Sequence, residues 1–479
     1  MAAGKPSRQT NAFPVVGIGA SAGGLDACKK LLDALPAGNG MAFILVQHLE
    51  PNHESMMVDL LAGNTSMTVR QATDGMPIER EHLYVIPPGV YLSVGNGALH
   101  LSPPDARHGA RLPIDFLLHS LAEEYGERAV CLILSGTGVD GSLGLKTVKE
   151  KCGLVIAQDP DEAEFDGMPR SAIMTGAVDR ILPVAKIPGA LVKYSRRKAQ
   201  ARAPDHSNSD DSLHGIVDLL RTTTDFDFTL YKPGTLRRRI ERRMGMTADE
   251  IHDMDRYCEL LRKDENELDD LAKDLLINVT NFFRDPAVFD FLAETTIPEL
   301  VDRHQAGHPL RIWIAGCSTG EEAYSLAMLF REQTSAAKRY IKIQIFASDI
   351  DPDAIATARE GYYPESIEAE VTPARLARFF SKDEQGYRII PALRASVIFT
   401  VQDVLNDPPF SRLDMISCRN LLIYLLPEAQ AKAVSLFHFA LREDGVLVLG
   451  AAESVGSSSD QFESISKPAR VYRHIGHRR

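Results

Sequence analysis

Short apolar segments alternate with amphipathic helical patterns along most of this chain. In the first half, the patterns predict strands at 14–20, 41–47, 83–86, 129–135 and 153–158, and helices at 25–35, 114–125 and 143–151. Strands with so few polar residues must be buried on both faces, as in parallel sheets whose crossover helices cover both sides. We therefore predict a doubly wound parallel sheet.

The second half begins with helical patterns alone. Residues 213–293 contain no convincing strand. Strands at 311–315, 341–347, 413–417 and 446–449 then alternate with helices at 321–331 and 352–360. Short segments between 361 and 400, such as 387–390 and 397–399, are expected to form a small antiparallel β insert. This half is predicted to be an all-α cap followed by a Rossmann-like α/β domain.

A polar segment separates the two halves. Residues 193–212 have almost no large apolar side chain and no periodicity, which is typical of a linker. We expect one domain at 12–192, the linker at 193–212, a helical domain at 213–293 and an α/β domain at 294–479.

Charge and cysteine content exclude several classes of protein. The 479 residues carry a net charge of −12, and an acidic chain is a poor general binder of nucleic acid. The six cysteines include no CxxC pair, so we expect reduced thiols and a cytoplasmic protein. No apolar run approaches the ~20 residues of a membrane span, and the first residues lack the apolar core of an export signal.

A glycine-rich turn containing a serine follows the first predicted strand. Gly17-x-Gly19-x-x-Ala22 fits a dinucleotide fingerprint, whereas Gly19-Ala-Ser-Ala-Gly23 fits a nucleophile elbow. A dinucleotide site needs an acid at the end of the next strand, but His48 is found there. A structural tight turn is the third alternative.

His48 and Asp140 each follow an apolar strand, and open α/β sheets place their sites at such carboxyl ends. The three residues then form a candidate triad: Ser21 as nucleophile, His48 as general base and Asp140 to orient the imidazole. The backbone N–H groups of Ala22 and Thr137 are the candidate oxyanion donors. The spacing of histidines and acids here matches no common metal site, and we expect no metal.

The first half resembles the catalytic domain of CheB-type chemotaxis protein-glutamate methylesterases. The resemblance is carried by Gly-Ala-Ser-Ala-Gly-Gly (19–24), Val-Gln-His-Leu (46–49), Pro-Pro-Gly (87–89), Leu-Ser-Gly-Thr-Gly-Val-Asp-Gly (134–141) and Asp-Gly-Met-Pro-Arg-Ser (166–171). It implies hydrolysis of glutamyl methyl esters on chemoreceptors by the same three residues, with glutamine deamidation as a further activity. Only about a dozen residues precede the first strand, so we expect no receiver-controlled activation in cis.

A second site follows the strand at 311–315. A small-residue loop leads into a helix that opens with Glu321 and Glu322. Acids at this end of a helix do not suit a phosphate, but they suit a cationic ligand. Asp349 follows the next strand, where an acid can bind ribose hydroxyls. A ligand with a ribose, a positive charge and no phosphate is S-adenosylmethionine.

The second half resembles CheR-type chemoreceptor glutamate O-methyltransferases. The matching motifs include Asn-Val-Thr-Asn-Phe-Phe-Arg-Asp (278–285), Cys-Ser-Thr-Gly-Glu-Glu (317–322), Ala-Ser-Asp-Ile-Asp (347–351), Ser-Cys-Arg-Asn-Leu-Leu-Ile-Tyr (417–424) and Ala-Glu-Ser (452–454). The resemblance implies contacts with S-adenosylmethionine, converted to S-adenosylhomocysteine, from Asn278, Thr280, Arg284, Glu321, Asp349, Asp403, Val404, Arg419 and Asn420. It favours Arg284 and Tyr424 for positioning the acceptor carboxylate. Asp403-Val404 departs from the usual neutral polar residue and Leu.

Residues 232–243 hold a cluster of basic side chains. Leu236, Ile240 and Met244 recur every four residues, so that face should pack while the arginines face solvent. A solvated charged helix is one interpretation, and nucleic acid is disfavoured because no aromatic platform accompanies the arginines. The resemblance favours docking of acidic receptor helices by Arg237, Arg238, Arg239, Arg242 and Arg243.

Together these features predict a cytoplasmic fusion of two opposing enzymes acting on a methyl-accepting chemoreceptor or a related signalling protein. Recruitment to membrane receptor arrays would bring the enzyme to that partner without membrane insertion. A signalling scaffold or S-adenosylmethionine sensor that has lost one or both activities is the alternative. A dinucleotide-dependent oxidoreductase is disfavoured because the strand-end acid is missing.

Overall fold

The computed structural model of the protein describes residues 13–476 apart from 48–55, 105–111, 201–208, 248–250, 252, 306 and 385. The chain divides near residue 206 into two compact units, which are described separately. Within the described ranges, every helix is too short or too polar to cross a bilayer. All six cysteines are buried free thiols.

The first unit is built on a seven-stranded, fully parallel sheet in the order β3-β4-β2-β1-β7-β8-β9. The predicted doubly wound sheet is therefore confirmed. Its central strands are apolar because both faces are covered. The strands are β1 (Val15–Ala20), β2 (Ala42–Gln47), β3 (Thr68–Gln71), β4 (His82–Val85), β7 (Ala129–Ile133), β8 (Leu154–Gln158) and β9 (Arg180–Leu182).

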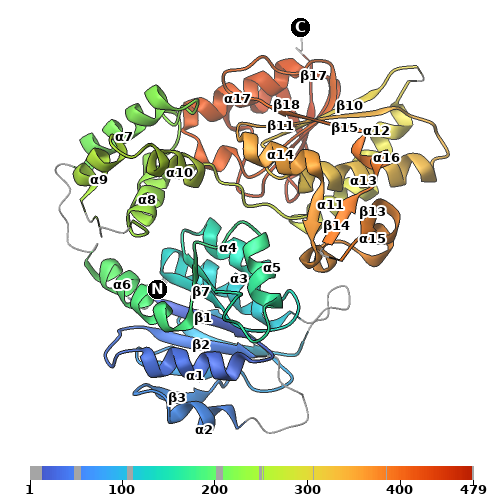
Figure 1. Ribbon diagram of the computed structural model, residues 1–479. Coiled ribbons are helices and arrows are strands. Elements are labelled where there is room, and N and C mark those ends of the chain that lie inside the picture. Colours follow the sequence, from blue (N-terminus) through green and yellow to red (C-terminus); the bar gives the residue numbers. More distant parts are fainter. Residues whose placement is uncertain are drawn as a thin grey trace, which may run out of the picture. The chain divides into compact units, whose positions relative to one another are not determined.

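Helices cover both faces of this sheet. In Figure 1, α3 and α4 lie on one face and α1 lies on the other. The strand order reverses between β1 and β7, which is the switch point where open α/β sheets place their ligands. The other elements are α1 (Gly24–Ala34), α2 (Met57–Ala62), the antiparallel hairpin β5 (Tyr91–Gly95) and β6 (Ala98–Ser102), α3 (Pro113–Tyr125), α4 (Gly144–Glu150), α5 (Gly167–Met174) and α6 (Ile187–Gln200).

Helices extend into the predicted linker 193–212 from both sides. Helix α6 continues to Gln200, and α7 begins at Ser209. Buried Leu191 and the Tyr194 hydroxyl, which donates to the Glu127 carbonyl, anchor α6 by its apolar face. A polar composition therefore hid an amphipathic helix end, because few apolar residues suffice for one packed face.

The second unit opens with the predicted all-α region. Its core includes Ile216, Leu220, Ile240 and Tyr257, which are all fully buried. Asp264 accepts hydrogen bonds from the backbone N–H groups of the following turn and so begins α10. The helices are α7 (Ser209–Thr223), α8 (Pro233–Met244), α9 (Met254–Leu261), α10 (Glu265–Leu275), α11 (Pro286–Phe291) and α12 (Ile297–Arg303).

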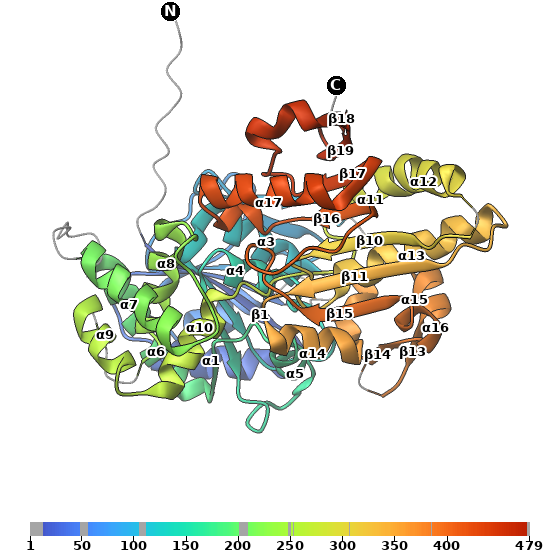
Figure 2. The same cartoon turned by 90° about the horizontal axis from the view of Figure 1, so that it is seen from above.

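A Rossmann-like sheet follows, in the order β15-β11-β10-β16-β17-β19-β18. Its first five strands are parallel, and β19 and β18 are antiparallel additions. Figure 2 shows α17 on one side of the sheet and α14 on the other. The elements are β10 (Leu310–Ala315), α13 (Glu321–Ala336), β11 (Ile343–Asp349), α14 (Pro352–Glu360), β15 (Val397–Val401), β16 (Leu413–Cys418), α17 (Pro427–Ala440), β17 (Leu441–Leu449), β18 (Phe462–Ser466) and β19 (Val471–His474).

The small β insert is present, but one of its expected strands belongs elsewhere. The three-stranded sheet consists of β12 (Tyr362–Pro364), β14 (Gly386–Ile389) and β13 (Phe380–Lys382), and it is accompanied by α15 (Pro373–Phe379) and α16 (Pro391–Arg394). Residues 397–399 instead form part of β15, which pairs in parallel with β11 of the main sheet. Local alternation identifies a strand but not the sheet that it joins.

Candidate active sites

Ser21 lies on the turn that connects β1 to α1. Its N–H donates to the Ser135 carbonyl at 3.1 Å, which ties the turn to the end of β7. Its carbonyl accepts from the Gly24 N–H at 3.0 Å and from the Gln47 side-chain amide at 3.4 Å. Gly23 has a φ of 70°, a conformation that favours glycine. The predicted serine turn is therefore built at the sheet's switch point.

These hydrogen bonds also fix the peptide plane between Ser21 and Ala22. The carbonyl and the N–H of a trans peptide point in opposite directions. Because Gly24 and Gln47 hold the Ser21 carbonyl, the Ala22 N–H is directed away from them. An N–H fixed in this way is the preorganised dipole that oxyanion stabilisation requires.

Asp140 is buried at the start of α3. Its two oxygens accept from the backbone N–H groups of Ile114 and Asp115, both at 3.0 Å. Asp115 in turn accepts from Leu143 at 2.9 Å and from Gly144 at 2.7 Å, at the start of α4. Burial, together with the charge of Asp140, raises the pKa of Asp115 well above its usual value. No sequence motif singles out this second carboxyl group.

The other two predicted residues of this site are Thr137 and His48, and only Thr137 lies within the described residues. Thr137 is exposed in the loop between β7 and α4, beside Gly136, whose N–H already donates to the Phe165 carbonyl. His48 lies outside the described residues. Its neighbour Gln47 pairs with Ala20, so β1 and β2 end at the same edge of the sheet.

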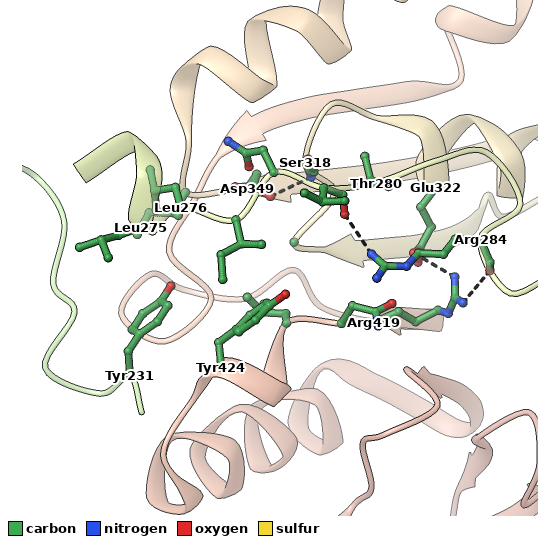
Figure 3. A pocket seen from close by; sticks show the side chains of 17 residues that line it. Tyr231, Leu275, Leu276, Thr280, Arg284, Ser318, Glu322, Asp349, Arg419 and Tyr424 are labelled. Carbon is green, nitrogen blue, oxygen red and sulfur yellow. Dashed lines mark hydrogen bonds and ion pairs between the residues drawn. The ribbon is translucent and has the colours of Figure 1, made fainter. Parts of the chain in front are cut away.

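The second unit contains a pocket at the carboxyl ends of β10, β11 and β16. Figure 3 shows the rings of Tyr231 and Tyr424 on one side of it and the Asp349 carboxylate on another. Its lining comes from both the helical and the α/β regions and consists of Tyr231, Leu275, Leu276, Ile277, Asn278, Val279, Thr280, Arg284, Gly316, Ser318, Glu322, Asp349, Ile350, Arg419, Asn420, Leu421 and Tyr424.

Asp349 is the acid at the end of β11. Its carboxylate accepts from the N–H groups of Ser318 at 2.8 Å and Asp351 at 3.0 Å. Burial raises its pKa, while these two hydrogen bonds oppose that shift. Ser318 adopts a positive φ of 49°, so the loop after β10 is bent toward this carboxylate. A strand-end carboxylate lining a pocket is suited to ribose hydroxyls.

Arg419 is paired inside the protein. Its guanidinium donates to Asp285 at 2.8 Å, to Glu322 at 3.2 Å and to the Arg284 carbonyl at 2.7 Å. The pocket thus has a buried cation neutralised by two acids, and the Arg284 segment is held against the end of β16. Arg284 itself donates to the Val279 carbonyl at 2.9 Å (Figure 3).

The pocket brings together most of the predicted cofactor contacts. Asn278, Thr280, Arg284, Asp349, Arg419 and Asn420 line it, as does the candidate substrate-positioning residue Tyr424. Three of the predicted contacts are not among its lining residues: Glu321, Asp403 and Val404.

Each of these three side chains has other partners. The Glu321 carboxylate accepts from the Thr319 hydroxyl at 2.6 Å. Asp403 accepts from Leu405 N–H and the Asn406 amide in its own turn, and Val404 packs against the domain core. The neighbouring Glu322 lines the pocket instead, because successive helical residues point about 100° apart.

Tyr231 enters the pocket from the segment before α8, and no sequence motif points to it. The Lys232 N–H donates to the Tyr424 carbonyl at 2.8 Å, and Tyr231 forms a β-bridge with Leu425. No spacing rule links residues almost two hundred positions apart, so only the fold could reveal this contact.

The prediction that the arginines of α8 all face solvent is wrong. Arg239 and Arg242 are buried, and the Arg239 guanidinium donates to the Asp274 carbonyl at 2.9 Å. Arg243 contacts Glu267 and Asp270 at 2.8 and 2.6 Å. The acidic stretch that follows α8 in sequence folds back as α10, so its carboxylates neutralise these arginines. Arg238 is exposed, and Arg237 is partly exposed.

Comparison with protein families assigns both units. Residues 16–191 match the CheB methylesterase family, 211–276 match the all-alpha domain of CheR methyltransferase, and 278–471 match its SAM binding domain. The chain is 32% identical over 238 residues to a chemotaxis protein methyltransferase of Listeria monocytogenes, spanning 49% of this chain and 86% of that protein. The chain belongs to the CheB methylesterase and CheR methyltransferase families. S-adenosylmethionine is the cofactor of its C-terminal domain.

Individual relatives cover different parts of this CheB–CheR chain. A 104.1 kDa protein of Rhodobacter capsulatus is 40% identical over 88% of the chain, which spans only 46% of that relative's length. A protein-glutamate methylesterase/protein-glutamine glutaminase of Anaeromyxobacter dehalogenans is 36% identical over 38% of the chain and 53% of its own length. The solved CheB catalytic domain of Thermotoga maritima is 32% identical, with 38% of this chain and 98% of that domain covered and a TM-score of 0.36.

Proposed function

We propose that this chain is a bifunctional enzyme that adds methyl groups to glutamate side chains of a chemoreceptor and removes them again. The observation that carries the proposal is the presence, in one chain, of a serine turn at the switch point of a CheB-type sheet and of a pocket in a CheR-type domain. Relatives named for each activity match the corresponding halves.

For demethylation, Ser21 is the proposed nucleophile, His48 the general base and Asp140 the residue that orients the imidazole. The Ser21 oxygen attacks the ester carbonyl, methanol leaves, and water then releases the glutamate. The Ala22 N–H, held by the peptide geometry described above, stabilises the oxyanion, with the Thr137 N–H as its proposed partner. Glutamine deamidation by the same acyl-enzyme route is supported by the name of the Anaeromyxobacter relative.

For methylation, the pocket residues bind and align the two reactants. When bound, S-adenosylmethionine supplies a methyl group on a cationic sulfur. A glutamate carboxylate, with a reference pKa of about 4.3, is already ionised at neutral pH, so no general base is needed. Asp349 is proposed to bind the ribose, while Arg284 and Tyr424 position the acceptor carboxylate. Glu321, Asp403 and Val404 remain family-based proposals, because their side chains are not among those that line the pocket.

Receptor docking is proposed for the exposed part of α8. Arg238, with Arg237 beside it, presents positive charge that would attract acidic receptor helices and make methylation sensitive to salt. The arginines on the opposite side already contact Glu267, Asp270 and Asp274. We expect Arg238→Glu to slow receptor methylation while leaving the affinity for S-adenosylmethionine unchanged.

The decisive experiment incubates the chain with S-adenosylmethionine labelled in its methyl group and a candidate chemoreceptor fragment. Base-labile label on the receptor is the expected product of the transferase. Release of labelled methanol, lost in Ser21→Ala but not in Ser171→Ala, is expected from the esterase. A chain that binds S-adenosylmethionine yet yields neither product with any receptor would instead be a scaffold or sensor.

A further inference from the structure

Glu453 is a buried acid beside the segment that lines the methyltransferase pocket. It follows β17, whose Leu449 pairs with Cys418 at the end of β16, so the segments after the two strands leave the sheet side by side. Glu453 is only 5% exposed, and it is not among the residues that line the pocket. A buried carboxylate is costly unless it is paired or hydrogen-bonded, so its partners reveal what it stabilises.

Those partners are backbone N–H groups. One carboxylate oxygen accepts from Gly450 at 2.6 Å and from Asn420 at 3.1 Å, and the other accepts from Ile423 at 3.2 Å. Within the described residues, no cation is paired with Glu453. Its charge is therefore compensated by the N–H groups that it draws together at the two strand ends.

Two of these N–H groups belong to the segment 419–424, which supplies Arg419, Asn420, Leu421 and Tyr424 to the pocket. Asn420 has a φ of 61°, a conformation that non-glycine residues adopt at some cost. A conformation of this kind persists only where neighbouring contacts enforce it, and the hydrogen bond to Glu453 acts on the N–H of that same residue.

We propose that Glu453 is a positioning residue of the methyltransferase and that its carboxylate holds segment 419–424 in the shape that binds S-adenosylmethionine. The inference rests on the proposed function and adds to it the group that prepares the cofactor site. If loss of the carboxylate leaves the competent shape only about one-tenth populated, the apparent Kd rises about tenfold.

The test measures the affinity of the full chain for S-adenosylmethionine by isothermal titration calorimetry. In Glu453→Gln the side chain keeps its size, but its amide NH2 group replaces an oxygen that accepts hydrogen bonds from backbone N–H groups. We therefore expect the Kd for S-adenosylmethionine to be about tenfold higher than in wild type. Glu453→Asp is shorter but keeps the carboxylate, and we expect it to bind more tightly than Glu453→Gln. Simple loss of packing would give the reverse order, since the shorter side chain leaves a cavity. The matched control is Glu463→Gln at an exposed position on β18.

A second variant covers the case in which Glu453→Gln does not fold. A Cβ at Gly450 would lie 2.6 Å from the Glu453 carboxylate and 2.9 Å from the Asn420 nitrogen, so Gly450→Ala should displace the contact and weaken binding similarly. Wild-type affinity in either folded variant, or tighter binding by Glu453→Gln than by Glu453→Asp, overturns the positioning role. Failure of the wild-type chain to bind S-adenosylmethionine overturns the proposed function itself.

Discussion

Replacement of Arg243 by methionine tests whether the arginines of α8 stabilise the helical region. The guanidinium contacts Glu267 at 2.8 Å, Asp270 at 2.6 Å and Asp274 at 3.4 Å, all from α10. Glu267 also accepts from the Tyr257 hydroxyl at 2.7 Å. A single side chain thus joins α8 to α10 and, through Glu267, to α9.

The size of the destabilisation depends on which carboxylates would lose their ion-pair partner in Arg243→Met. The side chains of Glu267 and Asp274 are 13% and 16% exposed, whereas that of Asp270 is 56% exposed and can be solvated by water. Breaking a buried ion pair costs about 3–5 kcal/mol, and partial exposure favours the lower end. Methionine keeps much of the apolar stem, so we expect Arg243→Met to lower the free energy of unfolding of this unit by about 3 kcal/mol. For a unit of this size that corresponds to a midpoint shift of roughly 6–12 °C.

The assay uses the single tryptophan of the chain, Trp313, which is fully buried in β10 of the second unit. Its fluorescence during heating reports the unfolding of that unit. Arg238→Met is the matched control, because Arg238 is exposed on the same helix and its loss should change stability by no more than about 0.5 kcal/mol. Equal shifts for the two variants, or an unchanged midpoint in Arg243→Met, would refute the reasoning.

Three further predictions address the two active sites. Because the pKa of Asp115 is raised, the folded state binds its proton more tightly than the unfolded state, so the contribution of Asp115 to stability falls as pH rises above about 4. Asp115→Asn removes this pH-dependent loss of stability. Calorimetry should therefore show the unfolding midpoint of the variant rising relative to that of wild type between pH 4 and pH 8. A difference in midpoint that stays constant with pH would contradict the raised pKa of Asp115. A Cβ at Gly136 would lie 2.9 Å from that of Ser21, so Gly136→Ala should reduce methanol release at least tenfold while methyl transfer stays unchanged. Asp349→Asn keeps the size of the side chain but loses its charge and should weaken S-adenosylmethionine binding about tenfold, and an unchanged Kd in titration calorimetry would exclude the ribose contact.

The local patterns of the sequence are sufficient to predict the two α/β units and the serine turn. Apolar strands spaced by helical segments permit few arrangements, and the carboxyl ends of parallel strands gather at one edge. Ser21, Asp140 and Asp349 were found because each follows a strand. The family resemblance implies Glu321 as a cofactor contact, whereas the pocket is lined by the adjacent Glu322. Local patterns do not distinguish neighbouring acids in the first turn of a helix.

The sequence by itself determined which elements form and which side chains stand at the ends of the strands, because hydrophobic periodicity and turn chemistry act over a few residues. Only the tertiary structure decided which charges meet. The arginines of α8 are neutralised by α10, Arg419 is paired with Glu322 and Asp285, and Glu453 holds the loop after a neighbouring strand. The physical reason is that burial and pairing depend on distances across the fold, which charge counts along the chain do not contain.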